Sequence, residues 1–371
     1  MNTPIRRSIG ILGGGQLGQM LAQAGTSLGA RFTVLDPGEN PPAACVAGQI
    51  RAAYDDEAAA ARLGQANEVV TYEFEHLALP AVAAAAAHAE LHPSLKALET
   101  VQDRIRQKTF LAAQGIATAP FAALVIEADL VTAATAIPGK AVLKTSRDGY
   151  DGKGQRRLAS SAELPAAWES LRHVPCVLEG FVTFSRELSL VSTRGRDGEM
   201  VFYPLVENHH EHGILRLTTA PAADITPDLQ RQAEDAARAL TEALAYVGTF
   251  TIEFFQVGDR LVVNELAPRV HNSGHWSIEG AVTSQFENHV RALMGLPLGQ
   301  TTPRGHAAMV NFVGAMPNPL ALCAIPGLHL HDYAKGPRRG RKLGHATLVD
   351  ADPERLRQRI AAVLALGGFE V

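Results

Sequence analysis

The chain has 371 residues, of which 46% are hydrophobic and 19% are charged, an ordinary composition for a soluble globular protein. One hydrophobic core rarely serves a chain of this length, so two or three domains are expected. The formal net charge of −4 gives no global basic field, which argues against nucleic acid as a partner. The three cysteines, Cys45, Cys176 and Cys323, are widely separated and odd in number. They fit the reduced thiols of a cytoplasmic protein better than a disulfide framework or a zinc site.

No stretch of the sequence predicts a secretory signal or a membrane span. The apolar run after Arg6 and Arg7 covers about four residues before the first glycines, too few for a signal peptide. The apolar stretch 81–87 is interrupted by His88 and Glu90, well short of the roughly 20 residues that a membrane helix needs. We therefore expect a cytoplasmic protein with no membrane partner.

The first expected elements are a strand at 8–12, a glycine-rich loop and a helix at 16–28, and a second strand follows at 31–36. The loop satisfies the pattern G-x-G-x-x-G with Gly13, Gly15 and Gly18. Asp36 follows at roughly the spacing of a ribose-binding acid, which suggests a dinucleotide site. Two interpretations stay open with equal weight: a polar or anionic ligand at the helix N-terminus, or close packing of the strand against the helix.

Two carboxylates follow the next expected strand, 68–72, which continues into the sequence TYEFEH. Glu73 and Glu75 are two positions apart, so both can leave one side of a strand end, and such ends face the ligand crevice in open α/β sheets. Solvated charge is the competing explanation. A helix at 81–90 then closes the N-terminal domain, 1–98.

A small α+β unit, residues 99–182, begins with a helix at 100–114 and surrounds a second glycine-rich loop. The loop follows Lys144 at a strand end and carries Gly149, Gly152, Lys153 and Gly154. Bare backbone amides and ammonium groups suit a polyphosphate, although a flexible surface hairpin is the competing interpretation. A turn has no need of Tyr150 and Asp151, which also lie in the loop, so we interpret it as a nucleotide lid.

The last strand of this unit, 174–180, leads into a segment whose carboxylate and backbone groups could hold an adenine edge: Glu179, Gly180, Phe181 and Val182. From 183 onward the pattern becomes antiparallel, with alternating segments, a helix at 228–246 and a hairpin. The tract 209–212 (HHEH) resembles a metal-binding tract, but we interpret it as a polar loop rather than a zinc site.

The hairpin joins strands at 249–257 and 261–266. If its turn takes three residues, Glu253 stands opposite Glu265, and if it takes two, Asn264 takes that place. Either register brings two carboxylates and an amide together, a set of oxygen ligands that suits Mg²⁺ bridging nucleotide phosphates. Solvated glutamates are the competing explanation, which the apolar strand around Glu253 disfavours.

Two further segments are rich in hydrogen-bond donors. The segment 267–276 suits a small anion such as a carboxylate or bicarbonate, with a capped turn as the alternative, and carries Arg269, His271, Asn272, Ser273 and His275. The segment 335–345 is expected to be a Gly/Pro-containing loop packed with Lys335, Arg338, Arg339, Arg341 and Lys342. In an acidic chain this cluster fits one phosphorylated small molecule better than nucleic acid or a solvated turn.

Several motifs occur in order along nearly the whole chain: GGGQLGQM (13–20), TYEFEH (71–76), GYDGKGQ (149–155), NELAPRVHNSGHW (264–276) and GRKLGH (340–345). With these motifs the chain resembles the N5-carboxyaminoimidazole ribonucleotide synthetases, ATP-grasp enzymes of de novo purine biosynthesis. The resemblance implies an α/β and α+β protein with the ATP-grasp fold, an N-terminal Rossmann-like domain (1–98), a small lid domain (99–182) and a C-terminal antiparallel β domain (183–371). It also implies a homodimer.

The resemblance further implies that ATP, bicarbonate and aminoimidazole ribonucleotide react through carboxyphosphate, with Mg²⁺ as the metal. Residues similar to the ATP ligands of the family are Arg104, Lys144, Gly149, Tyr150, Asp151, Gly152, Lys153, Gly154, Gln155, Glu179, Gly180, Phe181, Val182, Glu187, His210, Asn264 and Glu265. The metal ligands would be Glu253 and Glu265, and the bicarbonate group Arg269, His271 and Asn272. Positions expected around the ribonucleotide are Gln16, Leu17, Glu73, Ser273, Lys335, Arg341 and Lys342. Asp151, next to Tyr150, would take the proton from the attacking amine.

Two alternatives are weighed against this activity. A formate-dependent ribonucleotide transformylase is the nearest one within the ATP-grasp enzymes. An NAD-dependent oxidoreductase built on the first glycine-rich loop belongs to another class, and the two-carboxylate hairpin and the second glycine-rich loop argue against it.

Overall fold

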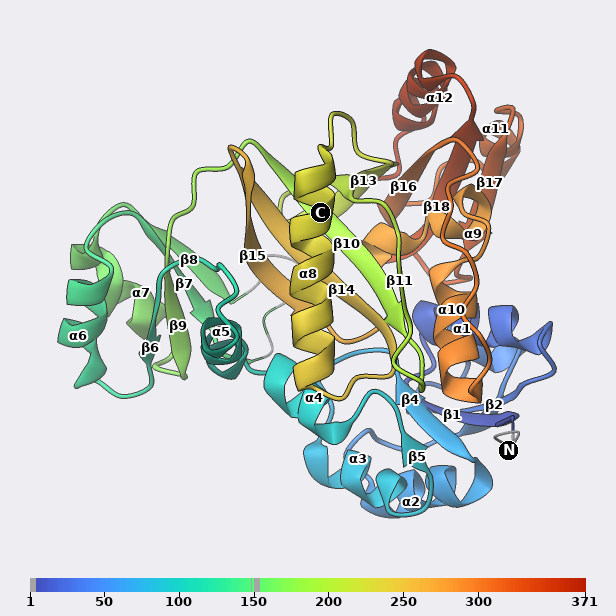
Figure 1. Cartoon of the computed structure of the whole chain (residues 1–371), viewed down its shortest axis with the longest axis horizontal. Helices are drawn as coiled ribbons and strands as arrows, with labels where there is room; N and C mark the ends of the chain where they lie inside the picture. The colour runs from blue at the N-terminus through green and yellow to red at the C-terminus, as the bar shows by residue number, and fades with distance from the viewer. Residues whose placement is uncertain (1–4, 148, 150–153) are drawn as a thin grey trace.

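The computed structural model describes residues 5–147, 149 and 154–371, and Figure 1 shows how three β-sheets divide this part of the chain. The sheets lie within residues 8–91, 121–180 and 186–350. We retain 1–98, 99–182 and 183–371 as our proposal for the domain bounds. No helix in the described ranges is long and apolar enough to cross a membrane.

The first sheet is parallel, with the order β3-β2-β1-β4-β5. Its elements are β1 (Ser8–Leu12), α1 (Gln16–Thr26), β2 (Arg31–Leu35), β3 (Gly48–Ile50), α2 (Glu57–Ala66), β4 (Val69–Tyr72), α3 (Leu79–Ala86) and β5 (Glu90–Leu91). The predicted helix at 81–90 is wrong at its end, because residues 90–91 pair with β4 instead. The strand order reverses between β1 and β4, so the residues that follow these two strands lie side by side at the crevice.

The second sheet is antiparallel, with the order β6-β9-β7-β8, and it forms the small domain at the left of Figure 1. Its elements are β6 (Phe121–Leu124), α6 (Asp129–Ala136), β7 (Ala141–Thr145), β8 (Gln155–Leu158), α7 (Leu164–Ser170) and β9 (Cys176–Gly180). The second glycine-rich loop joins β7 to β8. In the register, Val142 stands opposite Glu179, so Lys144, two positions along β7, lies on the same face as Glu179.

The predicted helix at 100–114 is wrong as one element, because the chain forms α4 (Leu95–Val101) and α5 (Arg104–Ala113). Asp103 ends the continuity: its side chain accepts hydrogen bonds from the backbone N–H groups of Ile105 and Arg106 at 3.0 and 3.2 Å and caps α5. The same carboxylate accepts a hydrogen bond from the Ser146 hydroxyl at 2.6 Å. The Asp103 carboxylate therefore both begins α5 and holds Ser146, at the start of the second glycine-rich loop.

The third sheet is the largest and follows the order β15-β14-β10-β12-β13-β16-β18-β17, with β11 paired to β10. Its strands are β10 (Arg186–Arg194), β11 (Met200–Phe202), β12 (Val206–Glu211), β13 (Ile214–Ala220), β14 (Gly248–Val257), β15 (Arg260–Ala267), β16 (His306–Gly314), β17 (Leu328–Asp332) and β18 (Arg338–Asp350). Its helices are α8 (Pro227–Ala243), α9 (Ser277–Gly280), α10 (Gln285–Met294), α11 (Pro319–Cys323) and α12 (Pro353–Ala365). Helix α8 covers one face, where Leu229, Ala233 and Leu240 join a core with Phe250 and Ile252 (Figure 1).

Two predicted loops belong to this sheet. The tract 209–212 is not a polar loop, because most of it lies in β12, paired with β13. The predicted basic loop at 335–345 is also largely wrong, because β18 begins at Arg338 and pairs with β16. In both segments the ladder hydrogen bonds to a neighbouring strand outweigh a polar composition that is typical of loops.

The β14–β15 hairpin combines features of both predicted registers. Val257 pairs with Arg260, so the turn takes two residues, and Phe254 pairs with Val263. A β-bulge then leaves Asn264 as the extra residue, and Glu253 stands opposite Glu265. The bulge thus delivers the carboxylate pair that a three-residue turn was expected to give.

A buried histidine joins the first sheet to the third. His289 on α10 accepts a hydrogen bond at Nδ1 from the backbone N–H of Thr249 at 2.9 Å. Its Nε2 lies 3.1 Å from the hydroxyl of Thr71 on β4. Because Nδ1 is the acceptor, Nε2 carries the proton and donates to Thr71. Burial lowers the pKa of His289 to about 3.

We expect the stability of the protein to fall as the pH drops below about 6.5, the pKa of an unfolded histidine. The folded pKa of His289 is depressed, so its contribution is fully present above pH 6.5 and is lost progressively toward pH 3, by about 1.4 kcal/mol per pH unit. Denaturant unfolding at pH 5 and pH 7 measures this slope. His289→Asn should flatten it by about one proton, and His306→Asn, at an exposed position, is the control. An unchanged slope in His289→Asn would contradict the assignment.

Candidate active site

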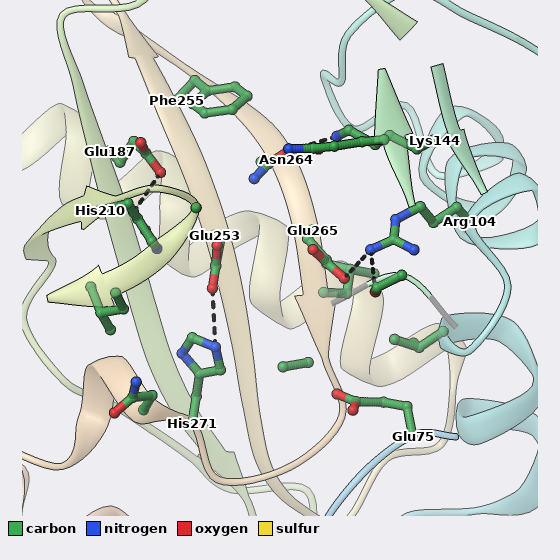
Figure 2. Close-up of a pocket in the computed structure, with 18 of the residues that line it drawn as sticks. Glu75, Arg104, Lys144, Glu187, His210, Glu253, Phe255, Asn264, Glu265 and His271 are labelled. Carbon is green, nitrogen blue, oxygen red and sulfur yellow. Dashed lines mark hydrogen bonds and ion pairs between the residues drawn. The ribbon is translucent and has the colours of Figure 1, made fainter. Parts of the chain in front are cut away.

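One cleft of about 1060 Å³ is lined by residues from all three sheets and from the loops between them. The small domain contributes Lys144 and Glu179, the large sheet contributes Glu253 and Glu265, and the N-terminal sheet contributes the residues around Glu73. Figure 2 shows side chains from β7, β10, β12, β14 and β15 directed into this space.

A buried carboxylate with two lysines lies at the small-domain side of the cleft. Lys144 Nζ lies 3.0 Å from Glu179 Oε2, and Lys108 Nζ lies 3.5 Å from Glu179 Oε1. Burial opposes ionisation of Glu179, but the two ammonium groups outweigh it and lower its pKa. Lys108 is only 1% exposed, and burial lowers its pKa to about 8. Lys144 also contacts the Asn264 amide oxygen at 3.4 Å, which connects the small domain to the bulge (Figure 2).

Arg104 connects the glycine-rich loop to the hairpin. Its Nη2 donates to the carbonyl of Gly149 at 2.8 Å and lies 3.3 Å from Glu265 Oε1 (Figure 2). At the other end of the loop, the backbone N–H of Thr145 donates to the carbonyl of Gly154 at 2.8 Å. Gly154 has a φ of +69°, and a Cβ there would lie 2.6 Å from the Thr145 hydroxyl, so this position requires glycine.

Glu253 and Glu265 face each other across the hairpin and both line the cleft. His271 Nε2 lies 3.0 Å from Glu253 Oε1 (Figure 2). Burial opposes ionisation of Glu253, but His271 outweighs it and lowers the pKa to about 2. Glu253 is therefore ionised at neutral pH, and two facing carboxylates form an oxygen-ligand set that fits Mg²⁺.

A second acidic–basic pair and an aromatic pair lie beyond the carboxylates. His210 Nδ1 lies 3.0 Å from Glu187 Oε2, and Glu187 outweighs the effect of burial and raises the pKa of His210. Phe184 and Phe255 stack with ring centroids 4.3 Å apart and line the same cleft. These flat rings offer an apolar surface suited to a planar base.

Arg269 and Asn272 provide donors at the junction with the N-terminal sheet. Arg269 Nε lies 2.9 Å from Glu75 Oε1, and Glu75 outweighs the effect of burial and raises the pKa of Arg269. Both polar atoms of the Asn272 amide are buried and lack hydrogen-bond partners among the described residues. Buried polar atoms of this kind call for a ligand or water. Ser273 is fully buried and serves the pocket indirectly, because its hydroxyl lies 2.8 Å from His271 Nδ1.

The first glycine-rich loop is occupied by a side chain of the protein itself. Glu73 accepts hydrogen bonds from the backbone N–H groups of Gly15 at 2.5 Å and Gly18 at 2.6 Å, at the N-terminus of α1. A Cβ on Gly13 or Gly15 would lie within 2.6 Å of Glu73, so the glycines serve this close approach. Asp36 accepts from the N–H of Gly14 at 2.9 Å. The packing interpretation of the motif therefore accounts for the contacts.

We expect no NADH binding at this loop, because the Glu73 carboxylate already occupies the backbone donors that a pyrophosphate would need. A titration that follows NADH fluorescence should give no saturable signal. The control is the same titration in excess ADP, which would displace NADH bound through its adenine nucleotide half elsewhere in the cleft. A saturable NADH signal that survives excess ADP would contradict this expectation.

The cleft brings together most of the predicted site residues, with four exceptions among those described. Ser273 lies behind His271, and Lys335 reaches the cleft through a hydrogen bond to Gln16, while Gly154 and Arg341 do not line it. Burial lowers the pKa of Lys335 to about 8. The predictions for Tyr150, Asp151, Gly152 and Lys153 fall outside the described residues.

Sequence reasoning missed several contributors to the site. Lys108 falls within the helix predicted at 100–114, and nothing local indicates that it meets Glu179, 71 positions later. Likewise, no role in the site was predicted for Asp103, Phe184, Phe255 or Tyr333. One signal was available: Lys108 lies at a spacing along α5 that is typical of the buried face of a helix.

The chain matches known families and proteins over nearly its whole length. Residues 6–102 match the ribonucleotide synthetase preATP-grasp domain, residues 109–286 the ATP-grasp domain, and residues 307–359 the phosphoribosylaminoimidazole carboxylase C-terminal domain. The N5-carboxyaminoimidazole ribonucleotide synthase of Pseudomonas aeruginosa is 48% identical over 358 residues, which cover 96% of this chain and 99% of that protein. The chain belongs to the N5-carboxyaminoimidazole ribonucleotide synthase family.

Solved structures of this synthase family have the same fold. The N5-carboxyaminoimidazole ribonucleotide synthetase of Thermus thermophilus superposes with a TM-score of 0.93 at 47% identity, over 96% of this chain and 98% of that one. The Aspergillus clavatus synthase, crystallised with ADP and 5-aminoimidazole ribonucleotide, gives 0.90 at 31% identity, over 97% and 98%. The predicted ATP-grasp fold, with its preATP-grasp and C-terminal domains, is thereby confirmed.

Proposed function

We propose that this chain carboxylates 5-aminoimidazole ribonucleotide with ATP and bicarbonate, giving N5-carboxyaminoimidazole ribonucleotide, ADP and phosphate. The observation that carries the proposal is that the groups around Lys144, Glu253 and Arg269 share one cleft with Glu73. The family membership and the relatives' names support it.

The first step makes bicarbonate reactive. Hydroxide leaves bicarbonate poorly, so ATP transfers its terminal phosphoryl group to a bicarbonate oxygen, and ADP leaves. The resulting carboxyphosphate loses phosphate readily. In this step Lys144 and Arg104 would neutralise phosphate charge, and the stacked pair Phe184–Phe255 with segment 179–182 would receive the adenine.

Glu253 and Glu265 would hold Mg²⁺, because they face each other across the hairpin and Glu253 is ionised. The bound ion would supply charge neutralisation for the nucleotide phosphates. Lys144 and Asn264 flank the pair, so cationic and amide groups surround the phosphate path.

Bicarbonate would bind at Arg269, His271 and Asn272. The unpaired amide of Asn272 and the cationic Arg269 are donors that suit a small planar anion. The amine of the ribonucleotide then attacks the carbon, phosphate leaves, and Asp151 would accept the amine proton. Closure of the lid would exclude water from these labile species.

The ribonucleotide would lie between the N-terminal sheet and the basic segment. Gln16, Leu17 and Glu73 line the cleft on one side, and Lys342 lines it on the other. Lys335 donates to Gln16 and lies between these two groups. By family membership we also propose a cytoplasmic homodimer, whose mass light scattering would measure.

Phosphate release from ATP tests the proposal. It should require both bicarbonate and aminoimidazole ribonucleotide for full rate, and the carboxylated product should match the phosphate released. Formate in place of bicarbonate is the control for a transformylase. Formate-dependent turnover, or turnover indifferent to the ribonucleotide, would overturn the proposed function.

A further inference from the structure

Glu75 is a carboxylate of the TYEFEH segment to which the proposed function gives no role. It lies two positions after Glu73, beyond the end of β4, and it lines the cleft (Figure 2). Its carboxylate Oε1 lies 2.9 Å from Arg269 Nε, and the two side chains are 14% and 19% exposed. The pair therefore joins the N-terminal sheet to the segment that follows β15, in a largely desolvated setting.

The contacts of Arg269 define which part of its guanidinium remains for a ligand. Glu75 lies beside Nε, and Nη1 donates to the carbonyl of Val270 at 3.1 Å. Among the described residues, these two contacts leave Nη2 and the second N–H of Nη1 for an anion. An arginine side chain has several rotatable bonds, and a carboxylate fixed on one edge of the guanidinium limits the orientation of the other edge.

The backbone of Glu75 is itself held in place. The N–H of Leu77 donates to the carbonyl of Glu75 at 2.8 Å, and the N–H of Glu73 donates to the carbonyl of Leu12 at 3.2 Å. The Glu73 side chain is bound by the N–H groups of Gly15 and Gly18. The same short segment thus contacts the glycine loop through Glu73 and Arg269 through Glu75.

We propose that Glu75 is a positioning residue that orients Arg269 for the bicarbonate-derived anion and ties this anion site to the N-terminal ribonucleotide-binding region. The inference rests on the proposed function and deepens it. Glu75 touches no reacting atom; it acts through Arg269. A misplaced Arg269 would let carboxyphosphate decompose before the amine attacks, so ATP would be consumed without product.

Glu75→Gln tests the proposal, because it keeps the size of the side chain and one acceptor oxygen but removes the charge. We expect KM for bicarbonate to rise roughly tenfold to a hundredfold, the range for a lost charge-assisted hydrogen bond, with KM for ATP unchanged. The ratio of phosphate released to carboxylated product should rise above one. Glu75→Asp, which keeps a carboxylate, should restore the ratio in part.

Glu287→Gln is the control for a lost glutamate–arginine pair, because Glu287 pairs with Arg291 on α10 and does not line the cleft. A purely structural role of Glu75 would lower the melting temperature and leave KM and the product ratio unchanged, and that result overturns the proposal. If Glu75→Gln does not fold, a double-mutant cycle with Glu75→Asp and Arg269→Lys tests the proposal instead. Additive effects of these two substitutions on KM for bicarbonate would overturn the proposal.

The proposed function and this inference fail in different ways. If the wild-type protein shows no turnover that depends on bicarbonate and ribonucleotide, both are overturned. If the wild-type protein has that dependence and Glu75→Gln matches it in KM for bicarbonate and in product ratio, only the inference is overturned. A bicarbonate-induced rise in the melting temperature of the ADP-bound protein, expected in wild type and lost in Glu75→Gln, gives a readout independent of activity.

Discussion

Replacing Glu265 by glutamine should abolish ATP turnover, with a loss on the order of a thousandfold. The amide is neutral and a poor ligand for a hard divalent cation, so the pair with Glu253 would lose half its charge. The ion pair between Arg104 and Glu265 would also be lost, which frees the Arg104 guanidinium. Phosphate release at limiting and at high Mg²⁺ measures the effect, and high Mg²⁺ should recover part of it.

Glu207→Gln controls for the loss of a glutamate from the same sheet. Glu207 pairs with Arg186 at 3.0 Å on β12 and does not line the cleft, so its substitution should leave turnover intact. Wild-type turnover of Glu265→Gln at limiting Mg²⁺ would refute the metal assignment.

Asp151→Asn should lower formation of the carboxylated product by roughly a hundredfold to ten-thousandfold while the protein stays folded. An asparagine cannot accept the proton of the attacking amine. Asp151 lies outside the described residues, and the flanking Gly149 lines the cleft and accepts a hydrogen bond from Arg104 at 2.8 Å. Product formation and phosphate release, measured together, separate carboxyl transfer from ATP cleavage, which should persist.

Asp259→Asn, at the exposed tip of the β14–β15 hairpin, is the control for a lost carboxylate. Product formation at the wild-type rate by Asp151→Asn would exclude the proton-accepting role. A parallel loss of ATP cleavage would instead place Asp151 at the nucleotide.

The main elements of the fold could be predicted from local patterns. The buried run of β1, the glycine loop and α1 follow from hydrophobic periodicity and turn chemistry, as does the amphipathic α8. The break before α5 was missed although its signal is local, since Asp103 caps the helix through the N–H groups of Ile105 and Arg106. The start of β18 at Arg338 was missed for a different reason: its pairing with β16 is a tertiary contact that composition does not reveal.

The site could be predicted where a motif carries its chemistry within a few positions. Arg269, His271 and Asn272 are such a group, and the cleft contains all three. The ion pairs Lys108–Glu179 and Glu75–Arg269 could not be inferred, since each pair joins segments that are distant in the sequence. The role of Glu73 as the cap of α1 could not be predicted either, because it depends on the strand order that sets β4 beside β1.

The bulge at Asn264 offers a separation-of-function experiment by deletion. Without that residue the two-residue turn would keep regular pairing, and the next position, now filled by Glu265, would still face Glu253. The hairpin would therefore retain both carboxylates. It would lose the Asn264 amide that Lys144 contacts at 3.4 Å and the Asn264 carbonyl that accepts a hydrogen bond from Lys108 at 3.1 Å. A single-codon deletion thus tests the proposed nucleotide contact of Asn264 apart from the proposed metal site, which substitutions at Glu253 or Glu265 cannot do.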